Sequence, residues 1–377
     1  MNYVMLKDVC AIKMGQSPDS NSYNDTGEGV PFFQGNADFG ERYPVTRKWC
    51  SVPTKMATQD DILISVRAPI GAMNYAKEDC CIGRGLAALT PDKSKVSSEF
   101  IFWLLKGKNA ELNSKGTGST FKAISRKVLE ETKVPKISLE KQKEFSEILE
   151  RIYGVIQARK EELQKLDELI KARFVEMFGT LDTPTQAFEK ATLKELCNKI
   201  TDGKHGGCKS EVGTERYFVG AREIYDDDVH YESAPEINIE EFEKDYKRCN
   251  VETGDFLIVN TGATIGKSAI ACDKRTEHTL LQKSVALLKV KKDVLNPIFL
   301  KWCYRVNTKM YMVENASAQP NLLLSKINAT VIYVPDIELQ NQFADFVHQV
   351  DKSKVAIQKA LDEAQQLFDS LMQEYFG

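Results

Sequence analysis

The sequence predicts an α+β protein: two strand-rich α/β domains separated by two long helices that form an antiparallel coiled coil, with pseudo-two-fold symmetry. Its 377 residues exceed one ordinary hydrophobic core and suit two domains of about 150 residues each. The sequence occurs twice along the chain, which indicates a domain duplication rather than a short-period solenoid. Each copy ends in a segment with helical periodicity, long enough for a coiled coil.

The repeat is clearest at the end of each copy. Residues 138–179 align without a gap with residues 336–377, so that Gln142 corresponds to Gln340. These matches predict a first domain at 1–136, a central helix at 137–179, a second domain at 180–335 and a C-terminal helix at 336–377.

The two domains are predicted to share their main elements. Residues 61–66 and 255–259 are short apolar runs that end in glycine turns, as buried strands do. The second domain also has Asn296 followed by Pro297, which is typical of a helix N-terminus. The remaining matched elements are a second pair of strands at 30–33 and 216–219, and one helix in each domain, at 99–106 and 297–305.

Both long helices carry a coiled-coil pattern. Apolar residues recur at alternating spacings of four and three from Phe145 to Met177 and from Phe343 to Tyr375, and the other faces are charged. Because both helices belong to one chain, the simplest arrangement pairs them with each other, as a rod of about 50 Å for about 35 residues. Pairing between two molecules is the alternative.

The composition is that of a soluble globular protein, with 42% apolar and 28% charged residues. No apolar run approaches the roughly 18 residues of a membrane span, and the first residues do not resemble a signal peptide, so we expect a cytoplasmic protein. The nine cysteines are an odd number without a CxxC pair, and the four histidines are isolated. We therefore expect neither a disulfide framework nor a metal site.

Charge is unevenly distributed along the chain. The net charge of −3 argues by itself against nucleic-acid binding. However, residues 1–136 contain 19 lysines and arginines against 15 acidic residues, whereas residues 336–377 contain 3 against 8. The acidic excess is concentrated at the C-terminal end, which leaves room for a DNA-facing surface in the domains.

Two segments resemble catalytic motifs but lack essential parts. Residues 262–268 resemble a phosphate-binding loop, but three residues instead of four separate the glycines, and the repeat partner at 68–74 lacks the lysine and serine. Residues 296–299 resemble the NPPY/F tetrapeptide of amino-methyltransferases, but Ile298 replaces its second proline, and helix capping explains the segment better. With no nucleophile triad, metal cluster or paired carboxylates, the chain does not read as an enzyme.

The duplicated pattern resembles the specificity subunit of type I restriction–modification systems. The resemblance covers the whole chain and occurs twice. It is carried by the segments VP at 134–135 and SLEKQ at 138–142, VP at 334–335 and ELQNQF at 338–343, DILI at 61–64 and DFLI at 255–258, and the FG that closes each helix.

The resemblance implies a division of labour. The domains at 1–136 and 180–335 would be target recognition domains, each reading one half of a split site in double-stranded DNA. The helices would be spacers that fix the gap between the halves and dock two modification (methyltransferase) subunits; restriction subunits join in some systems. S-adenosylmethionine and ATP would belong to those partners, and this chain would hold no cofactor and no catalytic residue.

Direct base readout uses arginine, lysine, amide and hydroxyl side chains on loops. Arg67 and Thr261 are the strongest candidates because both follow a buried strand directly. The candidate DNA-binding residues are Gln16, Ser17, Arg67, Lys115, Gly116, Ser119, Thr120 and Lys122 in the first domain, and Lys204, His205, Arg222, Thr261, Lys267, Gln319, Asn321 and Lys326 in the second.

Two other classes of function are compatible with the sequence. The chain could be a coiled-coil scaffold whose domains bind something other than DNA, which the acidic net charge favours. It could also carry methyl transfer itself, in which case the isolated chain would bind S-adenosylmethionine. The bases that each half recognises do not follow from sequence, because readout depends on loop geometry and DNA shape.

Overall fold

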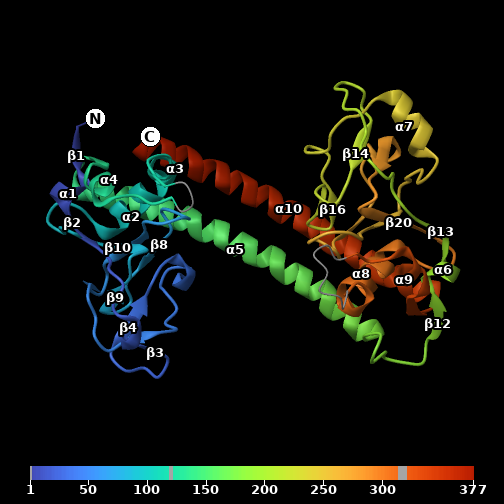
Figure 1. Cartoon of the computed structure of the whole chain (residues 1–377), viewed down its shortest axis with the longest axis horizontal. Helices are drawn as coiled ribbons and strands as arrows, with labels where there is room; N and C mark the ends of the chain where they lie inside the picture. Colours follow the sequence, from blue (N-terminus) through green and yellow to red (C-terminus); the bar gives the residue numbers. More distant parts are fainter. Residues whose placement is uncertain (1, 119–121, 313–320) are drawn as a thin grey trace. The chain divides into compact units, whose positions relative to one another are not determined.

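The computed structural model describes residues 2–118, 122–312 and 321–377. The chain divides into two compact units: unit 1 contains Met1–Lys160 and Gln358–Gly377, and unit 2 contains Glu161–Ile357. Each unit has one strand-rich domain and one part of each long helix, α5 (Leu139–Phe178) and α10 (Ile337–Phe376) (Figure 1). The predicted α+β class, with two strand-rich domains and two long paired helices, is confirmed.

Unit 1 is built around a four-stranded antiparallel sheet. Its strand order is β2-β10-β7-β8, and every residue of β7 is buried, as the continuous apolar run at 61–66 predicts. A five-stranded sheet, β3-β5-β4-β9-β6, includes the parallel pair β4 and β9, and β1 pairs with β11. The elements of its domain are β1 (Tyr3–Met5), α1 (Leu6–Val9), β2 (Cys10–Met14), β3 (Tyr23–Asn24), β4 (Val30–Phe33), β5 (Trp49–Cys50), β6 (Met56–Ala57), β7 (Ile62–Ser65), β8 (Met73–Tyr75), β9 (Cys80–Ile82), β10 (Leu86–Pro91), α2 (Ser98–Gly107), α3 (Asn109–Ser114), α4 (Arg126–Glu130) and β11 (Lys133–Pro135).

Unit 2 repeats this architecture. Its four-stranded sheet has the equivalent order β13-β20-β17-β18, β14 and β19 form the parallel pair, and β12 pairs with β21. Between β14 and β17, unit 2 has the hairpin of β15 and β16 and the helix α7, where unit 1 has β5 and β6. The elements of its domain are β12 (Glu189–Thr192), α6 (Leu193–Leu196), β13 (Cys197–Asp202), β14 (Tyr217–Val219), β15 (Ile224–Tyr225), β16 (Asp228–Val229), α7 (Ile239–Tyr246), β17 (Phe256–Val259), β18 (Ser268–Ile270), β19 (Thr279–Leu281), β20 (Val285–Val290), α8 (Pro297–Val306), α9 (Leu324–Ala329) and β21 (Val331–Val334).

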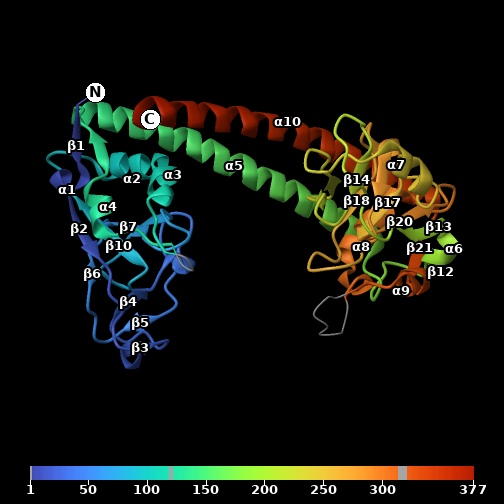
Figure 2. The same cartoon turned by 45° about the horizontal axis from the view of Figure 1, so that its top comes forward.

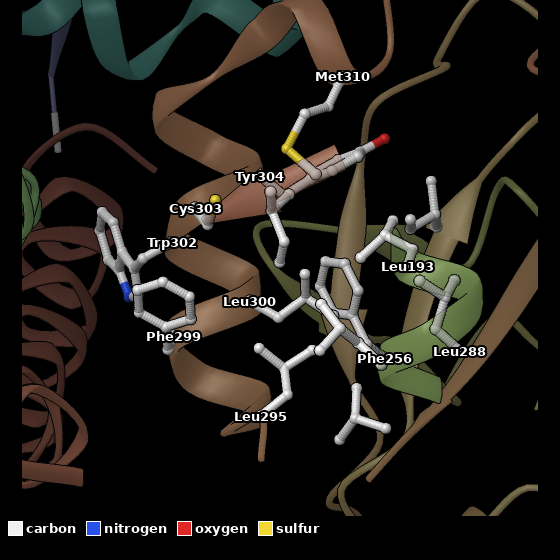
Figure 3. Packing of buried hydrophobic residues seen from close by; sticks show 14 of the residues in the cluster. Leu193, Phe256, Leu288, Leu295, Phe299, Leu300, Trp302, Cys303, Tyr304 and Met310 are labelled. Carbon is white, nitrogen blue, oxygen red and sulfur yellow. The ribbon is translucent and has the colours of Figure 1, made fainter. Parts of the chain in front are cut away.

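The long helices are part of the core of each unit. In unit 2, Phe299 and Trp302 of α8 lie on the side of the helix away from Phe256 of the sheet (Figure 3). There Phe299 packs against Phe174 of α5 with ring centroids 5.5 Å apart, and Trp302 meets Phe343 of α10 at 6.5 Å. Burial of such aromatic side chains is the main source of packing energy, so each domain is fixed to its part of the helix pair.

The two helices run antiparallel within each unit. In unit 1, Phe145 of α5 stacks on Tyr375 of α10 with centroids 3.8 Å apart. In unit 2, Lys354 Nζ lies 2.6 Å from Asp167 Oδ1, and Phe174 packs against Phe343. Positions that rise along α5 meet positions that fall along α10, as the repeat predicts. The helices of one chain therefore pair with each other, as the simplest arrangement predicted.

The two segments that resemble catalytic motifs have structural roles. Gly262 and Gly266 both adopt positive φ and form the turn between β17 and β18, so a strand rather than a helix follows. A phosphate-binding loop needs a helix N-terminus at that point. Asn296 caps α8: its side chain accepts a hydrogen bond of 2.8 Å from the Ile298 N–H. Both interpretations made from the sequence are thus consistent with the local geometry.

Candidate nucleic-acid interface

In unit 1, three strands of the central sheet end or begin at one edge, which we call the strand-end edge. It comprises the ends of β2 and β7 and the start of β10, which lie side by side (Figure 2). The Gly15 N–H donates to the Leu86 carbonyl at 2.9 Å, and the Val66 N–H donates to the Gly85 carbonyl at 2.9 Å. Residues that follow β2 and β7 or precede β10 are therefore neighbours, although they are far apart in sequence.

The loop before α4 joins this edge. The Ala68 N–H donates to the Lys122 carbonyl at 3.0 Å, and Arg67 forms an isolated bridge with Ala123. The structure thus brings together the exposed candidates Arg67 and Lys122. The candidate Gly116 lies beside Ile70, since a Cβ there would be 2.8 Å from Ile70 Cδ1.

The candidates Gln16 and Ser17 belong to the same edge. The Gln16 N–H donates to the Ile82 carbonyl at 3.0 Å. Ser17 Oγ lies 2.9 Å from Gln34 Nε2, which donates to it, and the Arg84 N–H donates to Ser17 Oγ at 3.4 Å. Of the other candidates in this domain, Lys115 is exposed and forms a 2.6 Å ion pair with Glu111. Ser119 and Thr120 lie outside the described residues.

Unit 2 has an equivalent strand-end edge, held by equivalent hydrogen bonds. The Gly203 N–H donates to the Val285 carbonyl at 3.1 Å, and the Asn260 N–H donates to the Ser284 carbonyl at 3.0 Å. Thr261 bridges Asn321, and its Oγ1 donates to Asn321 Oδ1 at 3.3 Å. The pairing of Thr261 with Asn321 corresponds to that of Arg67 with Ala123 in unit 1.

The candidate Lys204 forms ion pairs with two acidic residues. Its ammonium lies 2.6 Å from Asp245 and 3.7 Å from Glu241, both on α7, and its side chain is only 18% exposed. The hydrogen bond that Lys204 donates to Asp245 raises the pKa of Lys204, so its positive charge is retained but already paired. The neighbouring His205 lies 3.2 Å from Asp202. Both side chains therefore lie within ion-pair distance of acidic residues.

The remaining candidates of unit 2 are spread around the edge. Arg222 is exposed and follows Ala221, whose N–H donates to Ser284 Oγ at 3.2 Å. Lys267 is exposed at the end of the turn that Thr261 begins. Lys326 is exposed on α9, and its ammonium donates to the Met312 carbonyl. Gln319 lies outside the described residues.

Two exposed cations at this edge were not among the sequence candidates. Arg84 lies between β9 and β10, and Lys283 occupies the equivalent place between β19 and β20. The signal was present in the sequence, because residues 82–89 align without a gap with residues 281–288 and place Arg84 opposite Lys283. A basic residue at one position of both copies is more informative than loop composition alone.

The groups exposed at these two edges are of the kinds with which proteins bind DNA. Guanidinium and ammonium groups contact phosphates, and amide and hydroxyl groups read base edges. In the ranges that the structure describes, no group of three histidines, cysteines or acids could hold a metal ion. The same ranges include no helix that is long and apolar enough to cross a membrane.

The molecule is therefore a duplicated protein in which each copy presents basic, amide and hydroxyl groups at one sheet edge. Residues 1–168 and 186–365 match the type I restriction modification DNA specificity domain, and the chain belongs to this family. The resemblance seen in the sequence is confirmed. Membership in a family of specificity subunits agrees with the interpretation that the chain is not itself an enzyme.

Individual relatives cover the chain to different extents. The type I restriction enzyme MjaX specificity subunit of Methanocaldococcus jannaschii is 44% identical over 160 residues, which are 42% of this chain and 38% of that protein. The match thus spans well under half the length of that relative. The type I restriction enzyme EcoBI specificity subunit of Escherichia coli is 20% identical over 407 residues, covering 98% of this chain and 83% of that protein.

A solved structure shows the similarity over the whole chain. The S subunit of a type I restriction–modification system from M. genitalium has a TM-score of 0.60 and 15% identity, and the match covers 100% of this chain and 96% of that one. At this identity the similarity concerns the fold, which is the one that the duplicated sequence predicts.

Proposed function

We propose that this chain reads a two-part sequence in double-stranded DNA, with one part read by the domain at 1–136 and the other by the domain at 180–335. The observation that carries this proposal is the recurrence of the strand-end edge with an exposed cation, Arg84 or Lys283, at the same position in both units. The surrounding loops differ, so the two half-sites should differ in sequence.

The helices at 137–179 and 336–377 then have two tasks. They space the two half-sites, and they dock two modification (methyltransferase) subunits, to which restriction subunits can be added. S-adenosylmethionine and ATP bind to those partners and not to this chain. The complex works in the cytoplasm, with the DNA that it modifies. Family membership and the pairing of α5 with α10 support this arrangement.

The test is to co-express the chain with its modification subunit and to map methylated bases in the host DNA. The expected result is a split motif with a fixed unspecified gap. A continuous short motif, or no new methylation by a complex that assembles, contradicts the proposal. Saturable binding of S-adenosylmethionine to the isolated chain would favour a catalytic role. Assembly on a non-DNA partner would favour the scaffold.

A second experiment changes the spacing alone. Seven residues inserted after residue 160 of α5 and seven before residue 358 of α10 add about 10 Å of helix and keep the heptad phase. With base pairs about 3.4 Å apart, the gap should lengthen by about three base pairs while both half-sites stay the same. An unchanged gap in a complex that still methylates DNA would contradict the role of the helices as spacers.

A further inference from the structure

A glutamine and a glycine face each other at the strand-end edge of both units. In unit 1 the parallel strands β4 and β9 pair Phe33 with Ile82, so that Gln34 and Gly83 follow side by side. The Gly83 N–H donates to the Phe33 carbonyl at 2.8 Å. Because this edge also holds Arg84, the glutamine lies among the groups assigned to DNA binding.

Unit 2 has the same pair with the residues exchanged between the strands. The parallel strands β14 and β19 pair Val219 with Leu281, so that Gly220 and Gln282 follow side by side. The Gln282 N–H donates to the Val219 carbonyl at 2.8 Å, which is the bond that Gly83 makes in unit 1. The glutamine therefore comes from the first strand in one unit and from the second strand in the other.

In each unit the glycine leaves room for the side chain of the glutamine opposite it. A Cβ at Gly83 would lie 2.6 Å from Gln34 Oε1, and a Cβ at Gly220 would overlap the amide of Gln282. A Cβ at either glycine would displace the glutamine amide from its present position, so glycine on one strand leaves this position to the glutamine of the other strand. Two different local sequences thus place one amide at the same point of the edge.

The two amides are available for a ligand. Gln34 is exposed, and its amide is held by Ser17 Oγ, which lies 2.9 Å from Nε2 and 3.0 Å from Oε1. An amide has two donor hydrogens and two acceptor lone pairs, so even with Ser17 at both atoms one further hydrogen and one further lone pair remain. Gln282 is half-buried, and its amide makes no side-chain hydrogen bond to any residue that the structure describes.

We infer that Gln34 in unit 1 and Gln282 in unit 2 are specificity-determining residues, each of which reads one A·T base pair through the major groove. A glutamine amide matches adenine, because Oε1 accepts from the N6 amino group and Nε2 donates to N7. Arg84 and Lys283, next to the pair in each unit, hold the phosphates and fix the register. This inference rests on the proposed function and specifies which side chains perform it.

The test uses the complex of the full chain with its modification subunit, and measures its affinity for duplexes that carry every single base-pair replacement in both half-sites. Gln34→Ala should abolish discrimination at one A·T pair of one half-site, a loss of roughly ten- to a hundredfold in preference for that pair. Gln282→Ala should do the same in the other half-site. Gln59→Ala and Gln186→Ala, which truncate exposed glutamines elsewhere in the two units and outside the long helices, should leave both half-sites unchanged.

Three outcomes would overturn the inference. If both glutamine variants keep the full motif, or lose affinity equally for every duplex, the amides do not read bases; a change confined to a G·C pair also contradicts the assignment. Gln34→Glu keeps the size of the side chain and serves as a second variant in case truncation to alanine disturbs the fold. It should lose the same A·T preference. Gln34→Gly combined with Gly83→Gln recreates the order of unit 2 and should retain it. A wild-type complex without a split motif would contradict the proposed function instead.

Discussion

Gln142 ties the beginning of α5 to the domain of unit 1, and replacing it with leucine should be costly. The side chain is buried, and its Oε1 accepts a 2.9 Å hydrogen bond from the Ser97 N–H at the start of α2. Its Nε2 donates to the carbonyls of Lys95 and Ile137, both at 3.1 Å. Leucine has a similar volume but satisfies none of the three groups.

Gln340 makes the equivalent bonds in unit 2 and allows the experiment to be repeated. Its Oε1 accepts from the Asn296 N–H at 2.9 Å, and its Nε2 donates to Val294 at 3.0 Å and to Pro335 at 2.7 Å. The side chain is fully buried. The gapless alignment of the two helices is thus explained in part by one amide that must satisfy the same three backbone groups in both units.

The magnitude follows from the number of groups left unpaired. A buried donor or acceptor without a partner costs about 1–3 kcal/mol, and carbonyls are the less demanding of the two. One donor and two acceptors therefore give a loss of about 3–5 kcal/mol in the free energy of unfolding of the affected unit. Since a whole domain is stable by about 5–15 kcal/mol, this loss should be measurable in both variants.

The assay is urea unfolding combined with amide hydrogen exchange. Gln142→Leu should speed exchange in α2 and the start of α5, and Gln340→Leu should do so in α8 and the start of α10. The exposed Gln164 and Gln342 of the same two helices provide controls, because their replacement by leucine should change stability by less than 1 kcal/mol. A loss under about 1 kcal/mol for the buried variants, or faster exchange throughout the chain, would refute the reasoning.

Three further predictions concern charged residues. Arg84→Ala and Lys283→Ala should each weaken DNA binding by the complex for all sequences, and should reduce the slope of log K against log salt by about one, as measured in salt titrations. Lys204→Ala should leave DNA affinity unchanged and lower thermal stability, because it leaves Asp245 of α7 without its 2.6 Å partner. Lys106 lies 3.7 Å from the Tyr153 ring centroid, and burial lowers its pKa to about 8. The unfolded chain keeps this proton up to about pH 10.4. The contribution of Lys106 to the free energy of unfolding should therefore rise from about pH 8 to 10, by at most ~1.4 kcal/mol per pH unit. Subtracting the stability of Lys106→Met from that of the wild type at each pH isolates this contribution.

Controls separate these effects from general changes. Lys77→Ala and Lys274→Ala remove exposed lysines from the equivalent loops after β8 and β18, and should leave the salt slope unchanged. An equal loss in these variants would mean that only total charge matters. A marked loss of DNA affinity in Lys204→Ala would return that residue to the interface. A difference between wild type and Lys106→Met that does not vary with pH would contradict the depressed pKa.

The sequence by itself predicted the parts whose signals are local or repeated. The heptad spacing of α5 and α10 reflects one buried stripe on each helix, and the apolar runs at β7 and β17 reflect strands buried on both faces. The Asn296 cap of α8 is also read directly from residues next to each other. These features depend on neighbours within a few positions, so they are visible before the chain is folded.

Tertiary structure alone determined which side chains meet. Lys204 looked like any exposed loop lysine, but its charge is taken up by Asp245, a residue of a helix 41 positions later. Gln34 and Gln282 were not recognised, because their equivalence exists only through the parallel pairing of strands and through the glycine opposite each. The duplicated local patterns were enough to predict two copies of one architecture. The side chains at each strand-end edge were set by long-range strand register, which carries no periodicity for the sequence to display.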